Sequence, residues 1–495
     1  MPPAIVATGL SFCYPPPSPA LPAQQVLDGL DLQVGEGEAC AILGASGSGK
    51  STLCHLLAGL APRYTGGHSA GRLVVAGCEV QQAPPPVGAI GVLFQDAATQ
   101  LFNTTVENEV AWGLEALALP PVTIGERVMQ ALQRFGLLHL RYRPPWALSG
   151  GEQKRLALAA LWAMRPQVLI LDEPLGGLDP RGCIEVLAAL RALKAQGTTL
   201  LAATLRPQTA RLADHAALLA EGRLTSATTP EALLAEEARL YHAGIYFPPA
   251  RWPGLRPQRP LSADPPAVAL RQLRFRYPDG HAVLHGLDLT IPQGQFVALI
   301  GANGAGKSTL ARHLNGLLRP TAGEVRILGQ KIAGQAVGTI ARQVGFLFQR
   351  PEQQLFGATV REELAYGPRR LQLPDADARV ARALRHFELE AVAALPPAIL
   401  SYGTQRSVTL AALAALETPL LVLDEPTVGL DGAGWQQLLL WLAERRAAGV
   451  TLICITHELA LAAVADRVIA LHEGRLLADG DPAEVLPRLD PEVVA

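Results

Sequence analysis

The chain contains a second copy of much of itself, and this internal repeat constrains the fold more than any other feature. The segment GASGSGKST (44–52) recurs as GANGAGKST (301–309), and LILDEPLGGLDP (169–180) recurs as LVLDEPTVGLDG (421–432). The shift between the copies is 257 residues for the first segment and 252 for the second. Solenoid repeats are far shorter, about 20–50 residues each. The repeat therefore predicts a tandem duplication of whole domains.

The segment between the two copies differs from both in composition. Residues 241–267 read YHAGIYFPPARWPGLRPQRPLSADPPA and contain seven prolines. Proline at this density disfavours regular helix and central strand. We therefore expect a first domain at 1–240, a proline-rich linker at 241–267 and a second domain at 268–495.

Composition excludes several classes of protein. The formal net charge is −2 and only 17% of the residues are charged, so we expect no nucleic-acid partner. The six cysteines are scattered without a CxxC pair, which indicates reduced thiols rather than a disulfide framework. The sequence offers no uninterrupted apolar window of about 18 residues and no signal-peptide pattern. We expect no membrane-spanning segment.

Short apolar runs indicate the fold class. ACAILG (39–44) and FVALIG (296–301) lead into glycine-rich loops, and each loop is followed by apolar residues at helical spacing. VLILDEP (168–174) and LLVLDEP (420–426) are continuous apolar runs, as expected for strands buried on both faces of a parallel sheet. Strands that alternate with helices predict an α/β fold.

The glycine-rich loops match the phosphate-binding pattern G-x-x-x-x-G-K-[ST] in the strand–loop–helix context that it requires. Backbone N–H groups and the helix N-terminus would bind phosphate oxygens. Lys50 and Lys307 would reach the β- and γ-phosphates. One match could arise by chance, but two matches, each followed by an apolar strand ending in aspartate, argue against it. The predicted ATP-binding residues are Gly44, Ala45, Ser46, Gly47, Ser48, Gly49, Lys50, Ser51 and Thr52, and Gly301, Ala302, Asn303, Gly304, Ala305, Gly306, Lys307, Ser308 and Thr309.

Carboxylates follow the second apolar run of each copy. Asp172 and Asp424 are candidate Mg²⁺ ligands, together with the loop serines Ser51 and Ser308. The next residue in each copy, Glu173 or Glu425, could orient and polarise the attacking water. A single such glutamate would be a surface residue at a strand end. Its repetition within LDEP favours a catalytic role.

A third motif resembles a known family. LSGGEQKR (148–155) and LSYGTQRS (400–407) each place a serine 23 residues before the aspartate of LDEP. The first is similar to the signature of the ATP-binding-cassette (ABC) ATPases, and the resemblance covers almost the whole chain outside the linker. It implies two P-loop NTPase domains, each with a mainly parallel core sheet, an antiparallel β subdomain and a helical subdomain. It also implies an intrachain, head-to-tail pair in which each ATP lies between the phosphate loop of one cassette and the signature of the other.

The resemblance assigns further residues. Gln95 and Gln349 match the Q-loop glutamine, which contacts Mg²⁺ and the attacking water. Asp179 and Asp431 match the D-loop. Tyr14 and Tyr277 match the aromatic residue that stacks on adenine, although either alone could be a packed strand residue. The signature residues that would contact ATP are Ser149, Gly151, Ser401 and Gly403.

The two copies differ at the switch histidine of the family. His457 occupies this position in copy 2, and Leu205 stands there in copy 1. Copy 2 in turn has Tyr402 and Thr404 in its signature where copy 1 has glycine and glutamate. Head-to-tail pairing would bring these departures into one site.

We therefore predict asymmetry. Site 1, with Lys50, Glu173, Leu205 and LSYGTQ, would be impaired, whereas site 2, with Lys307, Glu425, His457 and LSGGEQ, would hydrolyse ATP. Loss of an oriented donor at the phosphoryl group costs on the order of 10²–10³ in rate. The alternatives are that Tyr402 is tolerated, or that Glu173 suffices without a histidine.

The segment after each Q-loop glutamine indicates which kind of ABC ATPase the chain resembles. The pattern Q-x-x-x-x-QLF-x-x-TV-x-x-E-x-A-x-G occurs in both copies, with Ala97 where copy 2 has Pro351. It resembles the ATPases of energy-coupling-factor (ECF) importers of vitamins and transition-metal ions. This implies a membrane T subunit, a substrate-binding S subunit and a peripheral location at the cytoplasmic face of the membrane. The alternative is a twin-cassette protein acting on the ribosome, which the proline-rich linker and slightly acidic charge disfavour.

Overall fold

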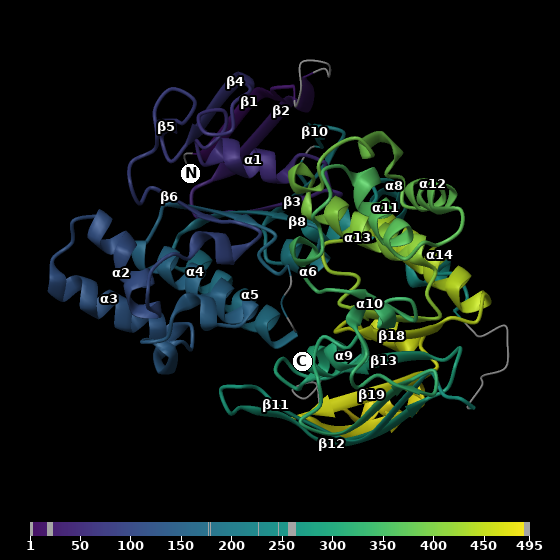
Figure 1. Ribbon diagram of the computed structural model, residues 1–495. Helices are drawn as coiled ribbons and strands as arrows, with labels where there is room; N and C mark the ends of the chain where they lie inside the picture. The colour runs from purple at the N-terminus through teal and green to yellow at the C-terminus, as the bar shows by residue number, and fades with distance from the viewer. Residues whose placement is uncertain are drawn as a thin grey trace. The chain divides into compact units, whose positions relative to one another are not determined.

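The computed structural model divides the chain into two compact units, Met1–Tyr246 and Phe247–Ala495. The structure describes residues 3–16, 23–176, 178, 180–225, 227–245, 247–255 and 264–489. Asp179, which the resemblance assigns to the D-loop, lies outside the described residues. Each unit contains one six-stranded and one four-stranded sheet with helices (Figure 1). The predicted α/β fold with two tandem P-loop domains is confirmed.

The core sheet of the first unit has the order β10-β9-β3-β8-β7-β6. All neighbours except β9 and β10 pair in parallel. The strands are β3 (Ala39–Leu43), β6 (Ile90–Leu93), β7 (Val168–Asp172), β8 (Thr199–Thr204), β9 (His215–Ala220) and β10 (Arg223–Leu224). Every residue of β3, β7 and β8 is buried, as their continuous apolar sequences require.

An antiparallel sheet, β2-β1-β4-β5, completes the β part of this unit. Its strands are β1 (Pro3–Tyr14), β2 (Gln24–Gly35), β4 (His68–Val75) and β5 (Cys78–Glu79). One apolar core joins this sheet to the core sheet through α1 (Lys50–Leu57), with Phe12, Leu53 and Ile170 among its members. The helix after the phosphate loop is thus held on both sides.

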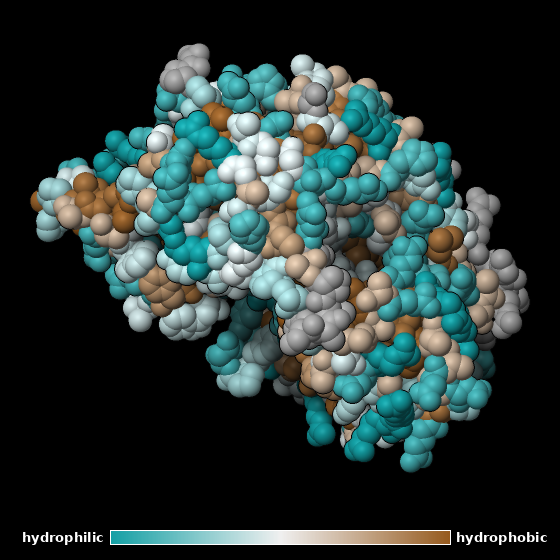
Figure 2. Space-filling view, turned by 90° about the horizontal axis from the view of Figure 1, so that it is seen from above, coloured by the Kyte–Doolittle hydropathy of each residue, from teal (hydrophilic) through white to brown (hydrophobic). Residues whose placement is uncertain are grey.

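Three helices of the first unit, α2 (Val106–Ala116), α3 (Pro121–Arg134) and α4 (Gly150–Met164), share a second core that includes Val110, Leu132 and Leu156. They form the predicted helical subdomain (Figure 1). Apolar side chains gather on the surface at the left of Figure 2. Val122 and Met129 of α3 are among the exposed large apolar residues of this subdomain. The remaining helices are α5 (Pro180–Ala195), α6 (Pro207–Ala210), α7 (Pro230–Ala235) and α8 (Glu237–His242).

The second unit repeats this arrangement. Its core sheet has the order β16-β17-β18-β13-β19-β20, and its antiparallel sheet has the order β12-β11-β14-β15. The strands are β11 (Val268–Arg276), β12 (Ala282–Ile291), β13 (Phe296–Ile300), β14 (Ala322–Ile327), β15 (Gln330–Lys331), β16 (Val344–Leu347), β17 (Leu420–Asp424), β18 (Thr451–Ile455), β19 (Arg467–His472) and β20 (Arg475–Gly480). The helices are α9 (Lys307–Leu314), α10 (Val337–Ile340), α11 (Val360–Arg370), α12 (Ala376–His386), α13 (Tyr402–Leu416), α14 (Gly432–Ala447), α15 (Leu459–Ala463) and α16 (Pro482–Val485).

Parts of the predicted linker pack on the two units. Helix α8 runs to His242, and Ile245 is buried in an apolar cluster of the first unit. In the second unit the Trp252 ring stacks on Trp435, with centroids 5.5 Å apart. The Arg446 guanidinium donates to the Leu255 carbonyl at 3.1 Å. The proline-rich composition does not reveal this packing, to which Ile245 and Trp252 contribute side chains and Leu255 a backbone carbonyl.

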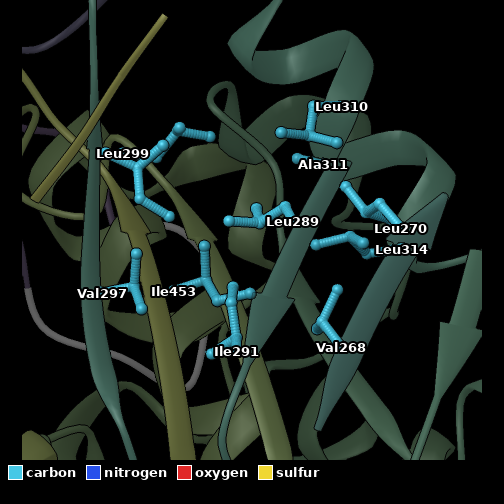
Figure 3. A pocket seen from close by; sticks show the side chains of 11 residues that line it. Val268, Leu270, Leu289, Ile291, Val297, Leu299, Leu310, Ala311, Leu314 and Ile453 are labelled. Atoms are coloured by element: carbon cyan, nitrogen blue, oxygen red, sulfur yellow. The ribbon is translucent and has the colours of Figure 1, made fainter. Parts of the chain in front are cut away.

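The second unit contains a cavity of about 10 Å³ between its antiparallel sheet, its core sheet and α9. All its lining side chains are apolar, and Figure 3 shows several of them, including Val268, Leu289 and Leu310, around the space. A site of this size holds at most about one water, and without polar partners it stays dry. It is a packing gap rather than a ligand site.

Candidate nucleotide site

The carboxyl ends of the parallel strands bring the predicted site residues to one edge of each core sheet. In the first unit β6, β7, β8 and β3 are consecutive neighbours. Gln95 follows β6, Asp172 ends β7, Leu205 follows β8 and the phosphate loop follows β3. Ligands of open α/β sheets bind outside these strand ends. The second unit has the same strand neighbours and the same loops.

The lysine of the first phosphate loop is hydrogen-bonded to the backbone of the same loop. Lys50 is buried, and its Nζ donates to the Gly44 carbonyl at 2.7 Å and the Ala45 carbonyl at 2.9 Å. Gly49 precedes the helix with φ 102°, and a Cβ there would lie 2.9 Å from the Leu27 side chain. Only glycine fits this position. The start of α1, directly after this loop, suits an anion.

The second phosphate loop has the same geometry. Lys307 Nζ donates to the Gly301 carbonyl at 2.5 Å and the Ala302 carbonyl at 2.9 Å. Gly306 has φ 96°. Above each loop lies the predicted adenine-stacking tyrosine. The Tyr14 hydroxyl is 3.3 Å from Thr52 Oγ1 in the first unit. In the second unit the Tyr277 hydroxyl is likewise 3.2 Å from Thr309 Oγ1. The structure thus brings both tyrosines to their phosphate loops.

The predicted metal ligands lie together in both units. Asp172 is hydrogen-bonded to Ser51, and Asp424 to Ser308. Burial raises the pKa of both aspartates above the usual value. Asp172 Oδ1 is buried without a hydrogen-bond partner, which suits a carboxylate placed to meet a cation. One carboxylate beside one hydroxyl fits Mg²⁺, which takes few protein ligands and completes its shell with phosphate and water.

The glutamate after each aspartate has a left-handed backbone. Glu173 has φ 47° and Glu425 has φ 49°. Their N–H groups donate to the carbonyls of Ala203 at 2.9 Å and Ile455 at 3.0 Å, which lie on the neighbouring strands β8 and β18. Such a conformation costs on the order of 1–3 kcal/mol for a residue other than glycine. It turns the carboxyl group back toward the phosphate loop.

In the first unit the Glu173 carboxylate faces Lys50 and Thr204. Lys50 Nζ is 3.9 Å from Glu173 Oε1, and Thr204 Oγ1 donates to Glu173 Oε2 at 3.4 Å. Burial raises the pKa of Glu173, and the Lys50 charge opposes this rise. Leu205 contributes a hydrogen bond to Glu173 only from its backbone. Thr204 is not among the site residues predicted from the sequence, although threonine also occupies the equivalent position 456 of the second copy.

In the second unit the Glu425 carboxylate faces a histidine. His457 Nε2 is 3.3 Å from Glu425 Oε1. Burial, followed by the nearby Asp424 charge, raises the pKa of Glu425 to about 8. The structure therefore brings together the predicted pair Glu425 and His457. The first unit places the apolar Leu205 where this ring would be.

The two signature serines cap helices. The Ser149 hydroxyl accepts from the Glu152 N–H at the start of α4, and the Glu152 carboxylate accepts from the Ser149 N–H in return. Ser401 caps α13 by accepting from the Thr404 N–H at 3.2 Å. Both serines are exposed. Tyr402 packs its ring against the loop after Glu425, where a Cβ on Gly429 would lie 2.4 Å from it.

Comparison with known proteins agrees with this geometry. The sequence model of a family described as ABC transporter matches residues 27–176 and 284–428, together more than half of the chain. A protein of Methanosarcina acetivorans, named as an ABC transporter ATP-binding protein, is 35% identical over 512 positions that cover 93% of this chain and 83% of its own. A protein of Streptomyces coelicolor with the same kind of name is 36% identical and covers 94% and 93%.

One similar solved structure is cbiO1 of Clostridium perfringens, described as part of the ABC transporter complex cbiONQ. It is 32% identical, covers 45% of this chain and 91% of its own, and superposes with a TM-score of 0.41. Both phosphate loops and both LDEP motifs lie within the two family matches. The chain therefore belongs to the ABC transporter family, as an ATPase with two fused ATP-binding cassettes.

Proposed function

We propose that the chain is the energising subunit of an ECF-type importer, bound at the cytoplasmic face of the membrane to a T-type membrane subunit that works with a substrate-binding S subunit. The transported solute would be a vitamin or a transition-metal ion. Within the described residues no helix is long and apolar enough to cross a bilayer. On this proposal the membrane subunits supply the translocation path.

The observation that carries this proposal is an exposed phenylalanine held by hydrogen bonds within the QLF…TV-x-x-E segment of the first cassette. Gln100 ties the loop to the end of β6, because its amide donates to the Val92 carbonyl and accepts from the Phe94 N–H, both at 2.8 Å. Glu109 accepts from the Phe102 N–H at 3.0 Å. These polar contacts hold Phe102 outward, so that 60% of it is exposed.

The exposed phenylalanine forms an aromatic pair in each cassette. Phe102 meets Trp112 edge-on, with centroids 4.9 Å apart. In the second cassette Phe356 meets Tyr366 at 4.6 Å, and Glu363 again accepts from the Phe356 N–H. All four rings are more than half exposed. Exposed aromatic pairs held by buried polar anchors suit an interface with another protein, and we assign them to the membrane subunit.

The chemistry we propose at the second ATP site uses the residues at the end of β17 and β18. Lys307 would hold the phosphates, Glu425 would accept the proton of the attacking water, and His457 would orient Glu425 and the γ-phosphate. Ser308, Asp424 and Gln349 would hold Mg²⁺, which neutralises charge on the phosphate oxygens. In the first ATP site we propose binding of ATP with slow or no hydrolysis.

Copurification tests the importer assignment. A tagged full-length chain should carry an integral membrane protein from detergent-solubilised membranes, and Phe102→Ser with Phe356→Ser should lose most of it. Val122→Ser is the control, because Val122 is exposed but lies outside the pattern. ATP binding should persist in all variants. Retention of the membrane protein by the double variant, or sedimentation of the chain with ribosomes instead, would overturn the proposal.

A further inference from the structure

Arg406 is a fully buried arginine that binds only backbone carbonyls and one hydroxyl. It lies in the second turn of α13, with 0% of its surface exposed. Its Nη1 donates to the Phe348 carbonyl at 2.7 Å, its Nη2 to the Gln349 carbonyl and its Nε to the Val428 carbonyl at 3.4 Å. The Tyr402 hydroxyl is also hydrogen-bonded to it. Within the described residues Arg406 forms no salt bridge, although the nearby Asp424 and Glu425 charges act on it.

The burial of the Arg406 charge has to be offset by its contacts. Burying an unpaired charge is costly unless its donors are satisfied. The planar fork of arginine can satisfy several carbonyls at once, which an ammonium group cannot do in the same geometry. The Arg406 guanidinium therefore satisfies its donors with three backbone carbonyls rather than with a carboxylate.

The carbonyls belong to two loops of the second ATP site. Phe348 and Gln349 follow β16, and Val428 follows β17 by way of Glu425. The two strands are parallel neighbours, with Leu347 beside Leu423. Their loops therefore leave the sheet side by side. Arg406 joins one loop to the other, and both to the helix that Ser401 caps.

The first cassette lacks this junction. Lys154 occupies the position equivalent to Arg406 and is also buried. Its Nζ donates to the Glu173 carbonyl at 2.8 Å and the Gly176 carbonyl at 3.0 Å. Both carbonyls belong to the loop after β7. Lys154 makes no hydrogen bond to Gln95, so the Q-loop of the described first cassette is not tied to its signature helix in this way.

We propose that Arg406 is a positioning residue that sets the Q-loop glutamine Gln349 relative to Glu425. It ties the Q-loop of the second ATP site to the loop after β17 and to α13, a tie that Lys154 does not make in the described first cassette. The proposal rests on the proposed function, in which the second site hydrolyses ATP. Tyr402, one of the two departures from the signature in this copy, contributes to the same junction by packing on the loop and bonding to the guanidinium. The residue that departs from the family pattern thus has a local role.

The experiment compares Arg406→Lys, which copies the first cassette, with Arg446→Lys. Arg446 is the matched control, because it is another buried arginine of the same unit, and it binds Leu255, Gly294 and Asp466 away from the site. Hydrogen exchange is measured on the nucleotide-free full chain. Arg406→Lys should speed exchange at amides 348–356 by about 10-fold, with 94–102 unchanged. Arg446→Lys should leave 348–356 unchanged.

Kinetics of the complex with its membrane subunits gives the second readout. Arg406→Lys should lower kcat about 10-fold with little change in KM, because misplacement acts on the reacting geometry. Placed on Gln349→Ala, the same change should have almost no further effect, because residues that act as a unit are not additive.

Three outcomes separate the ideas. Unchanged exchange at 348–356 overturns the proposal without any need for activity, and so does a kcat loss that is equal with and without Gln349. If Arg406→Lys does not fold, Arg406→Gln replaces it with the same expectations. If Glu425→Gln leaves hydrolysis intact, the proposed function fails, whereas the exchange result still judges the role of Arg406.

Discussion

The two cassettes place the same glutamate on the same backbone but surround its carboxylate differently. Glu173 and Glu425 have φ values within 2° of each other and donate to equivalent strands. Glu173 meets a threonine hydroxyl and the phosphate-loop lysine, whereas Glu425 meets a histidine ring. Both cassettes therefore share the backbone that carries this glutamate, and the side chains around its carboxylate differ. On our proposal these side chains separate a hydrolysing site from a binding site.

The two cassettes also differ in the buried cation of the helix that follows the signature serine. The buried cation after the signature is Lys154 in the first cassette and Arg406 in the second. The lysine holds one loop, and the arginine joins two. The cassette with His457 is thus also the cassette whose Q-loop is tied to its signature helix. We propose that both differences favour hydrolysis at the second site.

The largest effect should come from removing each glutamate in turn. Glu425→Gln should lower kcat by on the order of 10²–10⁴, because the positioned base is lost. Glu173→Gln should lower it far less. Steady-state ATPase activity of the complex measures both. Equal losses would mean that the two sites are equivalent or strictly coupled.

The histidine can be removed or restored. His457→Leu makes the second site resemble the first and should lower kcat by on the order of 10²–10³. Leu205→His supplies a ring near Glu173 and should raise turnover at the first site when Glu425 is already glutamine. A His457→Leu variant with unchanged ATPase activity would show that the histidine does not distinguish the sites.

Stability should depend on pH through Glu425. Its pKa is about 8 in the folded chain against 4.5 as the ordinary value, so the folded state binds the proton more tightly than the unfolded state. Without nucleotide this carboxyl therefore makes stability fall as pH rises from about 4.5 to about 8. Glu425→Gln should remove the loss and raise the unfolding free energy at pH 9 by on the order of a few kcal/mol. Thermal denaturation at pH 5 and pH 9 tests this, and an equal gain at both values would contradict it.

The smallest effect concerns the segment that enters the second cassette. Trp252→Ala removes the stack on Trp435 and should destabilise this unit by about 1 kcal/mol. Chemical denaturation measures the change. Trp146→Ala, at an exposed position of the first unit, is the control and should have almost no effect. Equal effects would indicate that the stack contributes nothing.

Much of the fold was predictable, because the signals were local. Strands β3, β7, β13 and β17 follow the apolar runs, and the phosphate loops follow the glycine pattern. The site pairs were predictable only through the family, since Glu425 and His457 are 32 residues apart and meet across neighbouring strands. The carbonyl contacts of Arg406 were not predictable, because no sequence pattern encodes which backbone groups a buried cation binds.

The central claim is that one cassette pair contains one hydrolysing site, and a single-turnover count tests it most directly. The complex is loaded with radiolabelled ATP at both sites, freed of excess nucleotide, started with Mg²⁺ and quenched in acid. If only the second site hydrolyses ATP, about one ADP should form rapidly per chain, and a second nucleotide should be recovered as ATP. Two ADP per chain formed at the same rate would contradict it.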